Sequence, residues 1–231
     1  MVSINSLIEF NSWTDELALK YKEVLFRGQR YPWKLLPNIV RVCKKETLLD
    51  IEIRLITAFK NEVQICLQNP TENIWDLLVV AQHHGLPTRL LDWSKEPLVA
   101  LWFAIENYKE KNSKPIVWCV RPEPRDYIEQ PHMERPFMGS RTKFFETNFL
   151  IPRIKAQKGC FTLFKYHESS NCGFIALEDN KTLKNRLHSC YIDISSCESL
   201  LEELEKKGIS RDSIYPELDV IVKKLKREIL G

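Results

Sequence analysis

The feature that most constrains the fold of this chain is a change of texture near residue 115. Before it, apolar residues recur at intervals of three and four, most clearly in TLLDIEIRLITAFKNEVQICL from Thr47, as on one face of an amphipathic helix. After it, short runs rich in β-branched and aromatic residues are separated by turn formers, as strands are. The sequence therefore predicts an α+β fold, with N-terminal helices followed by a mostly antiparallel sheet.

The N-terminal region predicts a helical segment and then a strand. Residues 3–19 carry apolar residues at mostly helical spacing and are expected to form one or two helices, with Ser3 as one N-cap and Ser12 or Thr14 as a second. The run EVLFRG at residues 23–28 is too short for a helix and ends in a glycine, so it predicts a short buried strand.

Two further helices flank a polar stretch. Thr71 is a possible N-cap for TENIWDLLVVAQHHG, which Gly85 would end, and Pro97 suits the first turn of EPLVALWFAIENY. Between them, residues 82–94 (QHHGLPTRLLDWS) lack apolar periodicity, so we expect a polar loop.

The second half predicts five strands and two closing helices. The helices are residues 197–208, stopped by Gly208, and residues 213–230, with basic side chains in the last turns. No repeat or low-complexity linker divides the chain, so residues 1–231 are expected to form one domain. The expected strands are PIVWCV, KFFETNFL, GCFTLF, GFIAL and SCYIDI.

Composition excludes several classes of function. Lys and Arg total 34 against 31 Asp and Glu, so the overall charge does not indicate a polyanionic partner and any basic site is local. No apolar run approaches the roughly 18 residues of a membrane span, which predicts a soluble, cytoplasmic protein. Seven cysteines without a CxxC pair favour buried free thiols and no structural metal.

Arg27, at the end of the predicted strand LFRG, is the first candidate site residue. A buried guanidinium must stay paired or solvated, because an isolated buried charge is costly. Arg27 therefore either has a structural partner such as Asp92 or uses its planar fork to hold a phosphate or carboxylate, with Gly28 letting the ligand approach the backbone.

The polar stretch is the second candidate. Its structural interpretation is an ion pair between Arg89 and Asp92, with Asp92 or Ser94 capping the next helix. Its functional interpretation is a binding loop. His83 and His84 are adjacent and do not have the spacing of zinc ligands, and the chain has no Walker loop, GxGxxG, GxSxG or HExxH motif.

Three segments resemble, in order and spacing, the broadly bacterial FRG domain family, named for its Phe-Arg-Gly motif. They span residues 25–162 as a motif core, with residues 196–231 left as a C-terminal helical segment. The segments are LFRGQRYPWKLLPNIVR, AQHHGLPTRLLDWSKEPLVALWFA and RIKAQKGCFT.

A more distant resemblance is to ADP-ribosyltransferases, in which a strand Arg or His helps hold NAD, a Ser/Thr motif precedes a helix, and a later strand supplies a glutamate. Arg27 in LFRG is similar to the first element, and Ser94 in LLDWSKEPLVALWFA to the second. At the third, AQKGCFTLF offers Gln157 and no glutamate, and a glutamine supplies no negative charge.

The resemblance implies an enzyme that uses NAD, either an ADP-ribosyltransferase or an NAD glycohydrolase, of the kind expected in toxin or anti-phage systems. Arg27 would hold the pyrophosphate, Ser94 and Gln157 the ribose, and Asp92 the developing positive charge. Gly28, Gln29, His84, Thr88 and Arg89 would complete the pocket.

Two alternatives stay open. The missing acid would be Glu146, Glu168 or Glu178 if it is not Asp92. In the other alternative, the same basic pocket serves a non-catalytic module that recognises a nucleotide, nucleic acid or protein.

Overall fold

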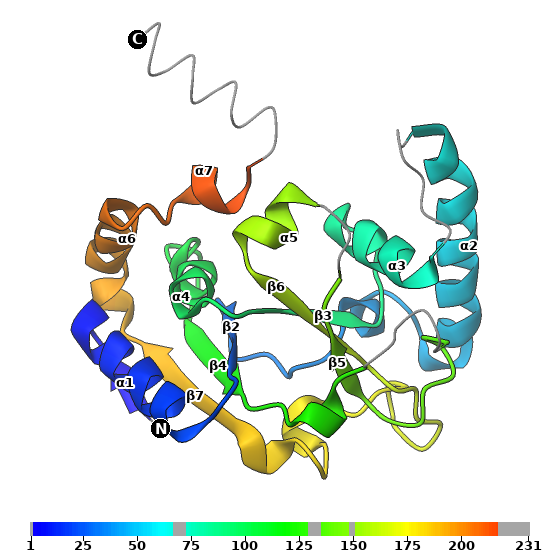
Figure 1. The fold of residues 1–231 in the computed structure, drawn as a ribbon, viewed down its shortest axis with the longest axis horizontal. Helices are drawn as coiled ribbons and strands as arrows, with labels where there is room; N and C mark the ends of the chain where they lie inside the picture. Colours follow the sequence, from blue (N-terminus) through cyan, green and yellow to red (C-terminus); the bar gives the residue numbers. More distant parts are fainter. Residues whose placement is uncertain (1, 67–72, 129–134, 148–150, 217–231) are drawn as a thin grey trace, which may run out of the picture.

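A computed structural model describes residues 2–66, 73–128, 135–147 and 151–216, which form an α+β fold around one mixed sheet (Figure 1). The strand order is β1-β7-β4-β2-β3-β6-β5, and every neighbouring pair is antiparallel except β1 and β7. The predicted fold class is confirmed to this extent. The strands are β1 Val2–Ile4, β2 Leu25–Gln29, β3 Leu90–Ser94, β4 Ile116–Val120, β5 Lys143–Phe145, β6 Gly159–Leu163 and β7 Leu187–Ile192.

The helices agree with the predicted periodicity, with a correction at the N-terminus. Ser3 does not cap the first helix, because it lies in β1 opposite Tyr191 of β7. The N-cap is Ser6, whose Oγ accepts a hydrogen bond from the amide of Glu9, and a single helix follows. The helices are α1 Leu7–Lys20, α2 Leu48–Cys66, α3 Ile74–His83, α4 Pro97–Ile105, α5 Pro152–Ala156, α6 Cys197–Lys206 and α7 Arg211–Ile214.

The strands were not all where the sequence indicated. Residues 90–94, expected in a loop, form β3 and pair along their whole length with β6. The run GFIAL is not a strand. Its last residue, Leu177, begins a 3₁₀ turn, Leu177–Asp179, and Phe174 and Leu177 pack in a buried cluster with residues of β2, β3 and β4. The front of the chain is mostly helical, as expected, but the sheet is not confined to the second half, since β1 and β3 join the predicted strand β2 in the first half.

Two helix ends also differ. Helix α3 begins after Asn73, whose side chain accepts a hydrogen bond from the amide of Trp75. The predicted cap Thr71 lies outside the described residues. The helix expected from residue 213 is represented by α7 alone, and its continuation beyond residue 216 also lies outside them.

The sheet is nearly divided at its middle. β2 pairs with β4 through all five of its residues, and β3 pairs with β6 through all five, but β2 and β3 meet through the single pair Phe26 and Ser94. Beyond that pair the two strands diverge and form a fork. Arg27 and Asp92 lie at the start of this fork, which positions the site described below.

Three buried clusters hold the helices to the two halves of the sheet. α1, α4 and α6 cover one face of the β1-β7-β4-β2 half, and α2 and α3 lie at the β3-β6-β5 end (Figure 1). A third cluster on β2, β3 and β4 is covered by the segment after β2, the start of α2 and residues 174–183. The sheet is therefore buried on both faces around the fork.

Gly28 brings α4 against β2. A Cβ at Gly28 would lie 1.9 Å from the carbonyl oxygen of Ala100 and 2.5 Å from the amide nitrogen of Ala104, both backbone atoms of α4 or its end. No side-chain movement can relieve such an overlap. The FRG glycine is thus required by helix packing, whereas the sequence had suggested close approach of a ligand.

We expect Gly28→Ala to lower the free energy of unfolding by about 1–3 kcal/mol, because α4 must move away from β2. The control is Gly139→Ala, where the nearest atom to an added Cβ is a carbonyl oxygen at 3.7 Å, an ordinary contact. Urea denaturation of both variants checks this. Equal stability of the two would contradict the packing argument.

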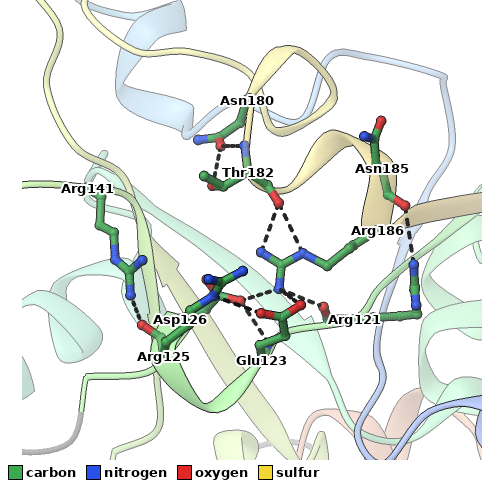
Figure 2. A network of polar contacts seen from close by, with 9 residues as sticks. All are labelled: Arg121, Glu123, Arg125, Asp126, Arg141, Asn180, Thr182, Asn185 and Arg186. Carbon is green, nitrogen blue, oxygen red and sulfur yellow. Dashed lines mark hydrogen bonds and ion pairs between the residues drawn. The ribbon is translucent and has the colours of Figure 1, made fainter.

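A polar network beyond the C-terminal end of β4 has a structural role (Figure 2). The buried Arg186 donates to the carbonyl oxygen of Thr182 through Nε and Nη2, at 3.0 and 2.8 Å, and to the carboxylate of Asp126 through Nη1. Asp126 in turn accepts from the amide of Glu123. Its members come from the segment after β4 and the segment before β7, so the network fixes these two segments to each other.

Candidate functional site

A cavity of about 380 Å³ lies at the fork between β2 and β3. Its walls come from five parts of the chain: β2 with the segment that follows it, the end of α3, β3, α4, and the turn from α5 into β6. Of the residues proposed from the sequence, it brings together Arg27, Gly28, Gln29, Asp92, Ser94 and Gln157. His84, Thr88 and Arg89 are not part of its lining.

Arg27 bridges the fork. Its Nη1 donates a hydrogen bond of 2.7 Å to the carbonyl oxygen of Asp92 and lies 3.8 Å from the Asp92 carboxylate. Burial lowers the pKa of Arg27 from its ordinary value, and the charge of Asp92 partly offsets this. The buried Nε has no hydrogen-bond partner among the described residues. Arg27 therefore has the expected structural partner and still has an unused donor in the cavity wall.

Asp92 is held by a short hydrogen-bonded relay. Its Oδ2 accepts from Nε2 of Gln82 at 3.0 Å, and Oε1 of Gln82 accepts from the hydroxyl of Thr88 at 2.6 Å. The hydroxyl of Thr88 also accepts from the amide of Leu90 at 3.1 Å. Thr88 is thus buried behind the cavity and acts on Asp92 through Gln82, a lining residue that the sequence reasoning did not single out.

Arg89 belongs to the core and not to the cavity. Arg89 is the most buried arginine among the described residues, at 1% exposure. Its guanidinium forms a multiple ion pair with Glu52, which is 0% exposed. Nε lies 2.9 and 3.0 Å from the two carboxylate oxygens, and Nη2 lies 2.5 Å from Oε2. The suggested pair of Arg89 with Asp92 does not form, because the carboxylate of Glu52 on α2 already occupies the guanidinium.

Ser94 and Gln157 line the cavity but also hold it together. The hydroxyl of Ser94 donates to the carbonyl oxygen of Gln157 at 2.6 Å and accepts from the amide of Glu96 at 2.9 Å. Nε2 of Gln157 donates to the carbonyl oxygen of Ile214 in α7 at 3.2 Å. The side-chain oxygen of Gln157 remains the group of this pair best able to accept from a ligand hydroxyl.

Glu106, which the sequence reasoning missed, is a second carboxylate in the lining besides Asp92. It follows α4 directly, and its side chain is 16% exposed against 52% for that of Asp92. Burial raises the pKa of the Glu106 carboxyl, and Arg211, Arg153 and Arg30 partly counter this. The only signal in the sequence was its place at the end of the helix that packs on LFRG.

Cationic and aromatic side chains complete the lining. Arg30 and Arg41 come from the segment after β2, and Arg153 comes from α5. Trp33 is partly exposed, and the guanidinium of Arg41 lies 4.8 Å from its ring centre. The cavity therefore combines positive charge with the aromatic side chains of Trp33, Phe103 and Phe161.

The other proposed acids lie elsewhere. Glu146 pairs with Lys95 at 2.6 Å, Glu178 accepts from the amide of Leu35, and Glu168 is exposed; none is in the cavity lining. The exposed His84 is also outside the lining, where its neighbour His83 takes part instead.

The described residues contain no group of three His, Cys, Asp or Glu side chains able to hold a metal ion. Cys43, Cys119, Cys160, Cys172, Cys190 and Cys197 are free thiols, and of these Cys43 and Cys172 are only half-buried. Within the same ranges, no helix has the length and apolar character needed to cross a membrane.

Comparison with known proteins supports the FRG resemblance. No curated protein and no solved structure matches the chain. A family model described as the FRG domain matches residues 22–113, which supply β2, α2, α3, β3 and α4 and hence most of the cavity wall. Residues 22–113 are therefore similar to the FRG domain family, in agreement with the resemblance of the sequence motifs.

Proposed function

We propose that this cavity binds NAD and that the protein cleaves the bond between nicotinamide and ribose, passing ADP-ribose to an acceptor or to water. The observation that supports this most is the meeting of Arg27, Gln157 and two carboxylates, Asp92 and Glu106, at one cavity. Its volume is in the range of about 300–1,000 Å³ typical of small-molecule sites. The resemblance of Arg27 and Ser94 to ADP-ribosyltransferase elements points to the same chemistry.

The lining suits a dinucleotide. Arg27 would bind the pyrophosphate through the donors that Asp92 leaves unused, helped by Arg30 and Arg153, because a guanidinium fork matches phosphate oxygens. Trp33 and Phe103 offer ring faces to a base.

The two carboxylates have separate tasks in this proposal. As the C1′–nitrogen bond breaks, its electron pair leaves with nicotinamide, and positive charge develops on the ribose. Asp92, held by Gln82, stabilises that charge. Glu106, whose pKa is raised, takes the proton from the water or acceptor group that attacks C1′. In this proposal the glutamate absent from the segment AQKGCFTLF is replaced by Asp92 of β3 and by Glu106, which directly follows α4.

A second candidate is a module that binds a nucleotide without turning it over. It is favoured by the internal hydrogen bonds of Ser94 and Gln157, which occupy groups that the enzyme would direct to the ribose. The two candidates are separated by product formation.

Incubation of the purified protein with NAD, with and without cell lysate, should release nicotinamide, measured by liquid chromatography. Binding measured by calorimetry without release would leave the recognition module. Neither binding nor release would remove both NAD proposals.

Arg27→Lys should weaken NAD binding by about tenfold or more, because lysine keeps the charge but loses the planar fork. The melting temperature should fall little, since one hydrogen bond to the Asp92 carbonyl is lost. Arg54→Lys, on the exposed side of α2 and outside the cavity, is the matched control. A drop in stability that accounts for the whole loss of binding would instead make Arg27 purely structural.

A further inference from the structure

Gln29 is a buried polar residue of the cavity lining, and no hydrogen bond within the described residues accounts for its side-chain oxygen. It is the last residue of β2, beyond the point where β2 and β3 separate, and it is 5% exposed. It lines the cavity, yet its side-chain oxygen is buried without a hydrogen-bond partner among the described residues. Leaving such an acceptor unpaired destabilises the folded protein, because the group has lost its hydrogen bonds to water.

The neighbouring side chains do not relieve that cost. Arg27 and Arg30 also line the cavity, and each has a buried Nε without a partner among the residues that the structure describes. The cavity wall formed by residues 27–30 thus contains one unused amide acceptor and two unused cationic donors. A ligand would satisfy this stretch if it placed a donor group against Gln29 and acceptor or anionic groups against the arginines.

We infer that Gln29 is a specificity-determining residue that recognises an amino group next to an acceptor on the ligand. An amide oxygen accepts from such an amino group while the amide nitrogen donates to the adjacent acceptor, the pairing that Gln and Asn make with adenine. NAD offers this chemistry twice, on the adenine edge and on the carboxamide of nicotinamide. The inference rests on the proposed binding of NAD and adds which group of NAD Gln29 contacts.

Two analogues distinguish the two sources. In nicotinamide hypoxanthine dinucleotide, an oxygen replaces the adenine amino group, and in 3-acetylpyridine adenine dinucleotide, a methyl replaces the carboxamide amino group. Calorimetry on the wild-type protein should show that one of them binds about tenfold or more weaker than NAD, since a buried acceptor is then left unpaired. The analogue that loses affinity identifies the end that Gln29 contacts.

The variants connect this preference to Gln29. Gln29→Leu should bind NAD and the discriminating analogue with equal affinity, whereas Gln29→Glu, which keeps an acceptor at the same place, should retain the preference. Melting curves confirm that each variant is folded, and the wild-type comparison stands if Gln29→Leu is not.

The outcomes separate this inference from the proposed function. If wild-type protein binds NAD but binds both analogues equally well, the role of Gln29 is overturned and NAD binding stands. A preference that persists in Gln29→Leu also overturns it. If wild-type protein binds none of the three dinucleotides, the proposed function fails, and the inference fails with it.

Discussion

Replacing Glu52 by glutamine should lower the free energy of unfolding by about 3–5 kcal/mol, the largest stability effect expected in this protein. The substitution keeps the size of the side chain but leaves the guanidinium of Arg89, 1% exposed, without its counter-charge. Glu52 comes from α2 and Arg89 from the turn before β3, so the pair also ties the helix to the strand. Urea denaturation followed by circular dichroism measures the loss.

The matched control is Asp179→Asn, which removes the charge from the exposed pair of Lys34 and Asp179 at 2.7 Å. That change should cost much less stability than Glu52→Gln, because solvent screens an exposed pair. Similar losses in the two variants would show that the burial of Glu52 and Arg89 is unimportant. NAD affinity, measured well below the melting temperature, should be unchanged in Glu52→Gln if Arg89 has no contact with the ligand.

Helices were predictable where local periodicity decides their structure. α2 and α4 follow from apolar spacing and from Pro97 at the first helical turn, signals that need no distant partner. β3 was missed because Asp92 interrupts an apolar run between two helices. Only pairing with β6, which lies much later in the chain, makes this segment a strand.

The site was predictable only as a set of candidate residues. Sequence motifs singled out Arg27 and Asp92, which the fork does bring into contact. They could not show that Arg89, three residues before Asp92, turns away to Glu52, because that depends on where α2 packs. Gly28 shows the same limit: its role is set by the backbone of α4, which no local pattern reveals.

The acids illustrate why an active site cannot be read from strand motifs alone. The expected position after α5 offers Gln157, and the sequence suggested Asp92 as the substitute. Its alternatives were Glu146, Glu168 and Glu178. Glu106 reaches the cavity because α4 packs on β2, so its carboxylate is brought near the fork from a different element. Its burial then raises its pKa, a property of the folded environment.

The largest effect on activity is expected from Asp92→Asn, which should reduce nicotinamide release by at least about a hundredfold while NAD binding stays measurable. The amide keeps the shape and the contact with Gln82 but removes the negative charge that stabilises the ribosyl cation, and charge stabilisation of this kind is worth about 10²–10³ in rate. Single-turnover assays with saturating NAD separate this loss from weaker binding.

Glu106→Gln should change the pH profile as well as the rate. A general base acts only when deprotonated, so wild-type turnover should fall as the pH drops through the pKa of Glu106, which burial places above the ordinary value for glutamate. Without that carboxylate the acidic limb should disappear, at a rate lowered about 10²–10⁴-fold. Glu168→Gln, an exposed acid outside the cavity, should behave as wild type. A different result would show that the acids are wrongly assigned. Turnover would then survive Asp92→Asn and Glu106→Gln but be lost in Glu146→Gln, Glu168→Gln or Glu178→Gln. The reaction would stand, because the chemistry would not need a carboxylate facing Arg27.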